Sequence, residues 1–592
     1  MNRKRMDSRN FNKPKNRKYT IKRLGDYLIQ FKWWLIVALI LTIATNLFSL
    51  IGPLLSGYAI GAIEPGVGAV DFNNVYKYAI LLIGFYTLSS ILSFILSILM
   101  IKISKIIVFK LRKDCFEKLV TLPVSYFDSN QTGDIISKMS YDIDTVNTSL
   151  SSDLISICTA IITVVGSFVM MLFIAPILVL IFVITIPISL LFTRLMLKKT
   201  HKLFKLRSKS LGDLNGYVEE MITGNKTIQA YAQEENKLLE FDKLNEIAVE
   251  SAFKAEYYSS ITGPGVNFVN NISLSLICMF GSLLYIFNRL TLSQISSFVL
   301  YSRKFSGPIN EIANLFTDFQ SALAAAERVF SLIDAEPEKP DVENAIVLTD
   351  ISGKVEFEHV KFGYTDDKII ISDLNLKVKP SSIIAIVGPT GAGKTTIVNL
   401  LMRFYDINEG NIRLDNNSIY GLKRKNLRLA YTMVLQDTWL FEGTVFENIA
   451  YGRSNVTKEE VINAAKAAHI HSFIERLPQG YDTIISEDGI NISKGQKQLL
   501  TIARAMLLDA KMLILDEATS NVDTRTEIKI QEAMQKLMEN KTCFIIAHRL
   551  STVQNADLIL VVNDGNIVEQ GTHQELLKQK GFYYELYHSQ YK

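Results

Sequence analysis

The sequence contains few of the residues that build disulfide frameworks or metal centres. It has four cysteines and seven histidines among 592 residues. The cysteines lack metal-ligand spacing, and two of them, Cys158 and Cys278, lie in long apolar stretches. The histidines form no cluster, since His469 and His471 would face opposite ways on a helix. We therefore expect neither a disulfide framework nor a metal site built from cysteine and histidine.

Two further absences concern processing and repeats. No low-complexity tract and no strong internal repeat stands out, apart from the alternation of apolar spans. We expect no cleavable signal peptide, because the first apolar run is too long and lacks a small-residue cleavage site. The chain length predicts several domains.

Apolar residues, in contrast, are abundant and concentrated in the first half. They make up 48% of the chain, which is high beside 21% charged residues. Six stretches are long enough to cross about 30 Å of hydrocarbon. These predicted spans are Trp34–Ile60, Tyr76–Ile103, Leu154–Ala175, Ile177–Leu197, Val266–Phe287 and Ile295–Leu315. Any single stretch could be a buried soluble helix, but six in succession favour a membrane domain.

The distribution of Lys and Arg predicts the orientation of these spans. The segment before the first span is rich in both, and the links after spans two and four are long and basic. The links after spans one, three and five carry little positive charge, with only Arg289 after the fifth. The positive-inside rule therefore places the N-terminus and the second half of the chain in the cytoplasm. Beside a membrane span, the basic N-terminal segment favours an anionic lipid surface over nucleic acid.

A glycine-rich loop in the second half predicts a phosphate-binding site. The loop follows an apolar run, Ile383–Val387, and precedes a helix-like run, Thr396–Leu401. This strand–loop–helix context is what a P-loop requires. Lys394 would reach the β- and γ-phosphate oxygens of a nucleotide, and the Thr395 hydroxyl would hold Mg²⁺. The predicted ATP-binding residues here are Gly388, Pro389, Thr390, Gly391, Ala392, Gly393, Lys394, Thr395 and Thr396. The alternative is a glycine-rich turn without a ligand.

Two consecutive acids predict the other half of this site. A short apolar run, Lys511–Leu515, ends in Asp516 and Glu517. A carboxylate at the end of a buried strand can join the Mg²⁺ shell, and the next carboxylate can polarise the attacking water. A strand end capped by solvated acids is the alternative, which the preceding P-loop disfavours.

Between these motifs, Asn491–Gln498 is similar to the signature of ATP-binding cassette (ABC) transporters, and the chain resembles that family over nearly its whole length. The resemblance implies that Tyr364 stacks on adenine and that Gln436 senses Mg²⁺. It also implies that His548 contacts the γ-phosphate, that Glu517 is the catalytic glutamate, and that Asp523 belongs to the D-loop. A second chain's nucleotide would be covered by the signature residues Ser493, Lys494, Gly495 and Gln496.

The signature departs from the family pattern at two positions. Ile492 replaces a leucine, which is a conservative change. Lys494 replaces a glycine, and it adds a cation at a turn that faces phosphate. Because a non-glycine residue tolerates a positive φ poorly, we expect Lys494 to impair the site that this signature completes.

The resemblance extends to the membrane half and implies an exporter. Tyr126–Ser137 and Glu219–Ile228 match the family's cytoplasmic coupling segments. The fold class is therefore multi-domain, an all-α transmembrane domain of six helices followed by an α/β P-loop ATPase domain. The expected domains are a basic segment (1–32), the membrane domain (33–333), a linker (334–353) and the nucleotide-binding domain (354–592).

The function implied is ATP-driven export of a small amphipathic compound, of the multidrug type, across the plasma membrane, with ATP and Mg²⁺ as cofactors. A lipid flippase and a peptide exporter share this architecture; the peptide exporter is disfavoured because no extra domain precedes the first span. An ATP-gated channel or sensor stays open. The expected partners are membrane lipids, a hydrophobic substrate and a second half-transporter, with a heterodimer favoured over a homodimer because of Lys494. Nucleic acid is not an expected partner.

The sixth predicted span carries ionisable residues, which are costly in a membrane and often functional. They are Arg303, Lys304 and Glu311, with Asp318 just beyond. We expect Glu311 to influence transport of cationic amphiphiles; a structural ion pair with Arg303 or Lys304 is the alternative.

Overall fold

A computed structural model describes residues 16–63, 70–365, 368–435, 438–485, 492–516, 523–547 and 553–590, with only the backbone described at 309–314, 316 and 590. The chain divides into two compact units. One comprises residues up to Val120 together with Thr132–Ala335, and the other comprises Thr121–Gln131 together with Glu336–Lys592. We call the first the helical unit and the second the cassette, and describe each by itself.

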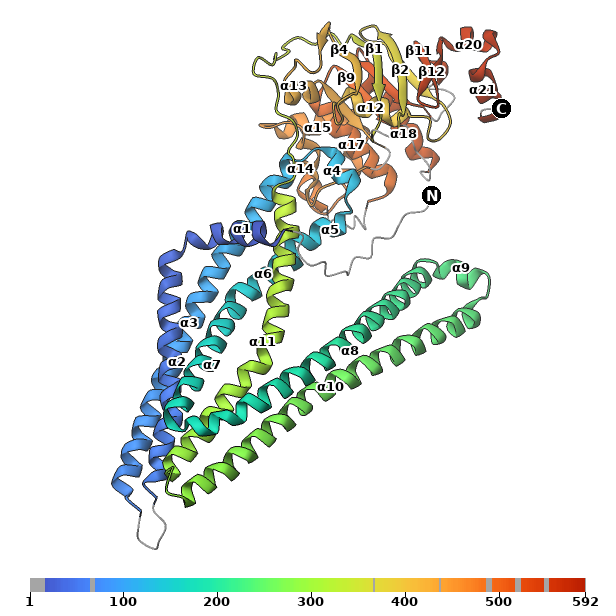
Figure 1. Ribbon diagram of the computed structural model, residues 1–592. Helices are drawn as coiled ribbons and strands as arrows, with labels where there is room; N and C mark the ends of the chain where they lie inside the picture. Colours follow the sequence, from blue (N-terminus) through green and yellow to red (C-terminus); the bar gives the residue numbers. More distant parts are fainter. Residues whose placement is uncertain are drawn as a thin grey trace. The chain divides into compact units, whose positions relative to one another are not determined.

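The helical unit consists of long helices joined by short connections (Figure 1). Two π-helical turns, η1 and η2, interrupt the segment that leads into α7. The elements are α1 (Arg17–Ile29), α2 (Lys32–Gly61), α3 (Phe72–Thr121), α5 (Thr132–Ser137), η1 (Lys138–Asp142), α6 (Ile143–Thr148), η2 (Ser149–Asp153), α7 (Leu154–Ile174), α8 (Pro176–Thr223), α9 (Asn225–Ala230), α10 (Glu234–Ile286) and α11 (Leu292–Ile333).

Five helical stretches among the described residues are long and apolar enough to cross a membrane. They are α2, α3, Thr132–Ile174, α8 and α10. The sixth predicted span lies within α11, which carries Arg303 and Lys304 and is not among the five. Several helices far exceed the predicted spans; α3, with 50 residues, is about 75 Å long at 1.5 Å per residue.

The helices of this unit meet in a small apolar core. Residues of α2, α7, α8, α10 and α11 contribute to it, among them Leu50, Met171, Phe182 and Tyr301. The buried Tyr301 hydroxyl donates a hydrogen bond to the Leu50 carbonyl at 2.5 Å. The Lys304 ammonium donates to the Ser49 hydroxyl at 2.6 Å. The side chain of Glu311 lies outside the described residues, so its predicted role stays a prediction.

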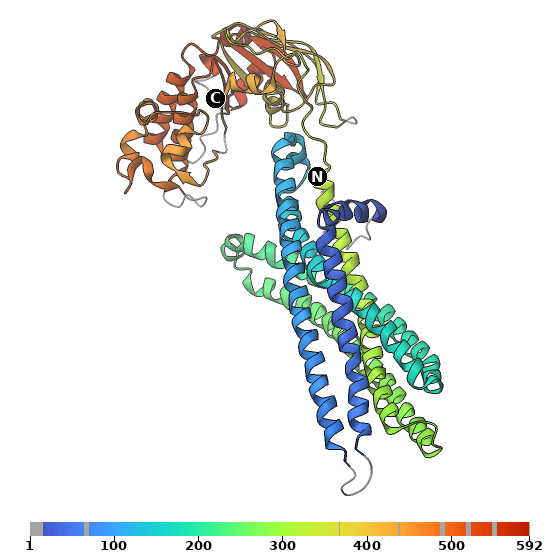
Figure 2. The same ribbon diagram turned by 90° about the vertical axis from the view of Figure 1, so that its left-hand side faces the viewer.

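Two arrangements in the helical unit are visible in the figures. Helices α8 and α10 run side by side as an antiparallel pair (Figure 1). Helix α1 runs crosswise to α2 (Figure 2). It is held by the Tyr27 hydroxyl, which donates to Asp114 at 2.6 Å, and by an ion pair of Arg23 with Asp334 at 3.0 Å.

The strands of the cassette form three sheets in the described residues. The central sheet has the order β12-β11-β3-β10-β9-β6 and is parallel except for β12; an antiparallel sheet has the order β2-β1-β4-β5, and β7 pairs with β8. The strands are β1 (Val355–Phe362), β2 (Ile371–Val378), β3 (Ile383–Val387), β4 (Glu409–Leu414), β5 (Asn417–Ser418), β6 (Tyr431–Val434), β7 (Gly443–Thr444), β8 (Ile484–Ile485), β9 (Met512–Asp516), β10 (Thr542–Ile546), β11 (Leu558–Asn563) and β12 (Asn566–Gly571).

Helices cover the central sheet on both faces. Successive residues of β3 alternate between two cores, with Ile384 and Ile386 on one face and Ala385 and Val387 on the other. This double burial explains why the strand is apolar throughout. The helices are α4 (Val124–Ser129), α12 (Lys394–Leu401), α13 (Arg424–Leu429), α14 (Val445–Ala450), α15 (Lys458–Ala467), α16 (His471–Ile474), η3 (Gly480–Asp482, a 3₁₀ turn), α17 (Lys494–Leu508), α18 (Thr524–Met538), α20 (His573–Gln579) and α21 (Phe582–Gln590).

The predicted fold class, an all-α apolar domain followed by an α/β P-loop domain, agrees with these two units. The compact units differ in one detail from the predicted domain ranges, because Thr121–Gln131 belongs with the cassette rather than with the helical unit. The ranges themselves stay a prediction.

Candidate nucleotide site

The predicted P-loop connects β3 to α12, as the sequence suggests. Gly388 begins the loop with φ at +152°, and a Cβ built there would lie 2.1 Å from the Val562 carbonyl oxygen. Gly393 is the N-cap of α12 with φ at +102°. Both positions therefore exclude a side chain, one by contact and both by backbone conformation. The helix begins two residues earlier than predicted, at Lys394.

Lys394 folds back over the loop. Its ammonium donates hydrogen bonds to the carbonyl oxygens of Gly388 at 2.7 Å and Pro389 at 2.9 Å. Burial lowers the pKa of Lys394 below its ordinary value, and the Asp516 carboxylate acts in the opposite direction. A half-buried cation beside the N-terminus of a helix creates a strongly positive locus, which suits phosphate.

Asp516 ends β9 on the same edge of the sheet as the loop. Strand β10 lies between β9 and β3, with Ile546 paired to both Asp516 and Ile386. Since carboxyl ends of parallel strands meet at one edge, this arrangement brings the acid to the loop.

The donor set around this edge fits Mg²⁺ bound through a nucleotide. No group of three or more His, Cys, Asp or Glu able to hold a metal occurs within the described ranges. The exposed Thr395 hydroxyl and the Asp516 carboxylate are the oxygen donors there. Mg²⁺ is commonly bound by one or two such ligands together with substrate phosphates and water, and it would neutralise phosphate charge at this site.

Tyr364 lies beside α12 in a cluster of aromatic rings. Its hydroxyl is 3.2 Å from the Thr396 hydroxyl, and the residue is 46% exposed. It meets Phe362 edge to face at a centroid distance of 5.0 Å and Tyr405 at 4.9 Å. Sequence reasoning overlooked Tyr405; an aromatic residue shortly after the P-loop helix was the available signal.

The signature residues form the beginning of α17. Ser493 is the N-cap, and it forms a capping box with Gln496. Lys494 is the first helical residue and is not among those with positive φ. The expectation that backbone strain at Lys494 would impair the site is therefore wrong, because the first helical position has a backbone conformation that any residue adopts. The remaining cost is electrostatic, since a cation is unfavourable at the positive end of the helix dipole.

Three predicted residues, Gln436, Glu517 and His548, lie outside the described residues. Asp523 is the N-cap of α18 and accepts a hydrogen bond from the Thr526 backbone N–H at 2.9 Å. Backbone N–H groups of this turn hold the pKa of Asp523 below its ordinary value. In the described structure the P-loop and Asp516 therefore lie at the same edge of the central sheet. The roles assigned to the candidate site residues stay predictions.

Two family models match the chain. The ABC transporter transmembrane region matches residues 35–309, and the ABC transporter domain matches residues 371–520. An uncharacterized ABC transporter ATP-binding protein of Bacillus subtilis, YfiC, is 42% identical over 98% of this chain and 96% of its own. A fatty acid ABC transporter ATP-binding/permease protein of Mycobacterium bovis is 43% identical over 88% and 83%.

Another relative and one solved structure extend this picture. An ATP-dependent lipid A-core flippase of Salmonella typhimurium is 35% identical over 97% of this chain and 98% of its own. The structure of a bacterial Atm1-family ABC exporter with ATP bound is similar with a TM-score of 0.75 and 28% identity, covering 95% of this chain and 98% of that one. The chain joins helices that are apolar enough to span a membrane to an α/β ATPase unit, and relatives match it along nearly its whole length. The chain therefore belongs to the ABC transporter family and is an exporter-type half-transporter with ATPase activity coupled to transport.

Proposed function

We propose that the edge of the central sheet binds and hydrolyses Mg·ATP to drive export. The observation that carries this proposal is the convergence of the P-loop, Lys394 and Asp516 at the carboxyl ends of β3 and β9. The P-loop amides and Lys394 bind phosphate, and Tyr364 stacks on the base. Thr395, Gln436 and Asp516 are the Mg²⁺ ligands, with Asp516 acting through water. Glu517 accepts a proton from the attacking water, and His548 contacts the γ-phosphate.

The test is transport and hydrolysis by a matched pair of variants. Glu517→Gln keeps the shape of the side chain but removes the base, so ATP binding should persist while hydrolysis and ATP-dependent accumulation in inside-out vesicles are lost. Lys394→Ala should weaken ATP binding itself. Hydrolysis by Glu517→Gln near the wild-type rate would contradict the catalytic role, and ATP-independent flux would favour a channel.

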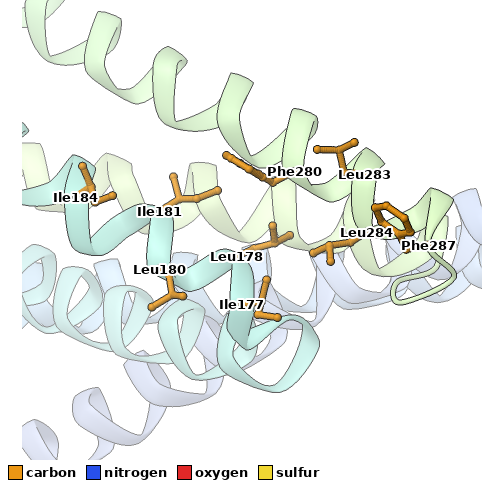
Figure 3. Close-up of a pocket in the computed structure, with 9 residues that line it drawn as sticks. All are labelled: Ile177, Leu178, Leu180, Ile181, Ile184, Phe280, Leu283, Leu284 and Phe287. Carbon is orange, nitrogen blue, oxygen red and sulfur yellow. The ribbon is translucent and has the colours of Figure 1, made fainter.

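The substrate that we propose is a small amphipathic compound of the multidrug type. Support comes from an apolar groove of about 320 Å³ between the start of α8 and the end of α10 (Figure 3). Its lining consists of hydrocarbon side chains, namely Ile177, Leu178, Leu180, Ile181, Ile184, Phe280, Leu283, Leu284 and Phe287. Such a surface accepts the apolar part of an amphiphile and discriminates little by shape.

A lipid is the second candidate substrate, and two observations favour it. Relatives are named for a fatty acid and for lipid A-core. The groove also ends at Phe287, two residues before the exposed cation Arg289. An acyl chain in the groove would bring an acidic headgroup near Arg289, where the attraction is charge-assisted.

These candidates are separated by a competition experiment in proteoliposomes. Uptake of the cationic dye ethidium should be inhibited little by palmitate if the multidrug assignment is right. Uptake of labelled palmitate, lost in Arg289→Gln, would instead establish the lipid candidate. Phe280→Ala should weaken uptake of either probe, while Phe268→Ala, also exposed on α10 but outside the groove, serves as the control.

Exporters of this family act as dimers, and we propose that this chain pairs with a different half-transporter. The support is the side chain of Lys494, which adds a cation at the phosphate-facing end of α17 although the backbone there is regular. Purified alone, the chain should hydrolyse ATP slowly, and a second half-transporter should restore activity. A stable homodimer with rapid hydrolysis, unchanged in Lys494→Gly, would refute the heterodimer.

The proposed location is the plasma membrane, with the N-terminus and the cassette in the cytoplasm. The Lys and Arg bias of the links supports this orientation. Protease added to inside-out vesicles should remove the cassette, whereas the same protease outside right-side-out vesicles should leave it intact.

A further inference from the structure

A segment of the first long link is part of the compact cassette. Helix α4 lies within Thr121–Gln131, which packs with Glu336–Lys592 (Figure 1). Its residue Asp128 accepts a hydrogen bond from the Tyr405 hydroxyl. Burial, followed by this bond, raises the pKa of Tyr405, so the phenol stays protonated and acts as the donor. The segment and the loop between α12 and β4 are thus joined by a specific polar contact.

Tyr405 also touches the aromatic residue proposed to hold the base. The rings of Tyr364 and Tyr405 meet nearly perpendicularly, at 85° and a centroid distance of 4.9 Å. The ring of Phe362 contacts both edge to face, at centroid distances of 5.0 Å from Tyr364 and 5.8 Å from Tyr405, and Phe362 is 2% exposed. Since edge-to-face pairs are directional, the orientation of one ring restricts the other.

Tyr364 has one anchored end and one accessible face. Its hydroxyl contacts Thr396 and also accepts from Asn399 at 3.4 Å, and both partners belong to α12. Nearly half of the side chain is exposed. A base stacked on this ring would remove its remaining freedom, and the rigid contact with Tyr405 would carry that restriction toward Asp128.

We propose that Tyr405 is a positioning residue that transmits adenine stacking on Tyr364 to Asp128, and so orders α4 when the site is filled. This inference rests on the proposed function, in which Tyr364 stacks on the base. Tyr405 itself touches neither phosphate nor base. The start of the segment is held separately, since the Glu338 backbone N–H donates to the Thr121 carbonyl at 2.9 Å. The nucleotide-dependent effect therefore belongs to the Asp128 end.

The experiment measures hydrogen exchange in residues 124–130 of the full chain in lipid nanodiscs. The two probes are Mg·ADP and magnesium tripolyphosphate, which share phosphates but differ in the base. Mg·ADP should slow exchange of the α4 amides by about fivefold, the lower end of measured coupling between sites. Tripolyphosphate should slow it much less, because it cannot stack on Tyr364. Equal protection by both probes would overturn the proposal.

Single-atom variants locate the contact. Tyr405→Phe keeps the ring but removes the donor, so the ADP-dependent protection should disappear while the dissociation constant for ADP stays within about twofold. Asp128→Ala should act in the same way, and Asp128→Asn, which keeps an acceptor oxygen, should restore most of the protection. Because Asp128 is exposed, its variants test the contact even where Tyr405→Phe folds poorly. Wild-type protection in Asp128→Ala would refute the inference.

Two controls separate this inference from the proposed function. Tyr584→Phe removes a phenol from α21, outside the aromatic cluster, and should leave exchange in α4 unchanged. Loss of protection in this control as well would overturn the assignment to Tyr405. Tyr364→Ala should weaken ADP binding; an unchanged affinity would remove Tyr364 from the nucleotide site, whatever the Tyr405 variant does.

Discussion

Replacing Glu338 by glutamine should destabilise the cassette. Glu338 accepts hydrogen bonds from two nitrogens of Arg428, at 2.6 and 3.2 Å, and lies 3.6 Å from the Arg424 guanidinium. Arg428 also donates to the carbonyl oxygens of Met402 and Arg403, just after α12. The Glu338 carboxylate therefore pairs with two arginines of α13. Through Arg428 it also holds the turn that follows the P-loop helix α12.

The size of the effect follows from this geometry. The side chains of Glu338 and Arg428 are 25% and 30% exposed, and that of Arg424 is 9% exposed. Hydrogen bonds to charged groups contribute about 1.5–3 kcal/mol net, and glutamine keeps one acceptor oxygen, so we expect a loss of about 2 kcal/mol. The buried Arg424, whose Nε has no hydrogen-bond partner among the described residues, would keep its charge in a less favourable field. For a domain of this size, the midpoint temperature of thermal unfolding should fall by about 4–8 °C.

The assay is thermal unfolding of the full chain, followed by circular dichroism at one fixed scan rate so that variants can be compared. Glu336→Gln is the matched control, since Glu336 carries the same charge two residues earlier and is exposed. A double-mutant cycle with Arg428→Gln should show that the two changes together cost less than their sum. Equal midpoints for Glu338→Gln and Glu336→Gln would refute this reasoning.

Three further predictions concern the cassette. Gly388→Ala should weaken ADP binding about tenfold in calorimetry, because its Cβ would meet the Val562 carbonyl; an unchanged affinity would contradict the strained loop. Thr457→Ala removes the capping box with Glu460 and should lower the free energy of unfolding by about 1 kcal/mol, as measured by thermal unfolding. An unchanged free energy would show that the cap does not stabilise the cassette. Burial lowers the pKa of His573, so the unfolded state binds more protons. The stability should be greatest above the ordinary value of 6.5 and decline as the pH falls through the folded pKa; His573→Gln should reduce that slope, and an identical slope would argue against the burial effect.

The local elements of the cassette were largely predictable from sequence. The expected strand at the P-loop, Ile383–Val387, is β3 without change. In the same way, the apolar run Leu558–Val562 followed by Asn563-Asp564-Gly565 predicts a hairpin, and the β11–β12 pair has its turn there. In each case a short apolar run and its adjacent turn residues determine the structure, so information within about ten residues suffices.

Contacts between distant positions were not predictable in the same way. Asp128 and Tyr405 are 277 positions apart, and neither has a pattern that names the other. The positive φ expected at Lys494 is absent for a related reason, since φ at that position depends on where α17 begins rather than on residue type. For the membrane spans, hydropathy located the apolar cores but not the helix ends, because polar helices continue beyond them.

The assignment of Thr121–Gln131 to the cassette has a consequence for biosynthesis. The ribosome makes this segment more than two hundred residues before the sheets that it joins, and three of the five candidate spans among the described residues lie in between. The cassette is therefore discontinuous in sequence, and it is complete only when the C-terminal half has packed against a segment that was synthesised earlier. A cassette made without the earlier segment would lack Asp128, the hydrogen-bond acceptor of the Tyr405 hydroxyl, so the C-terminal half alone is an incomplete domain.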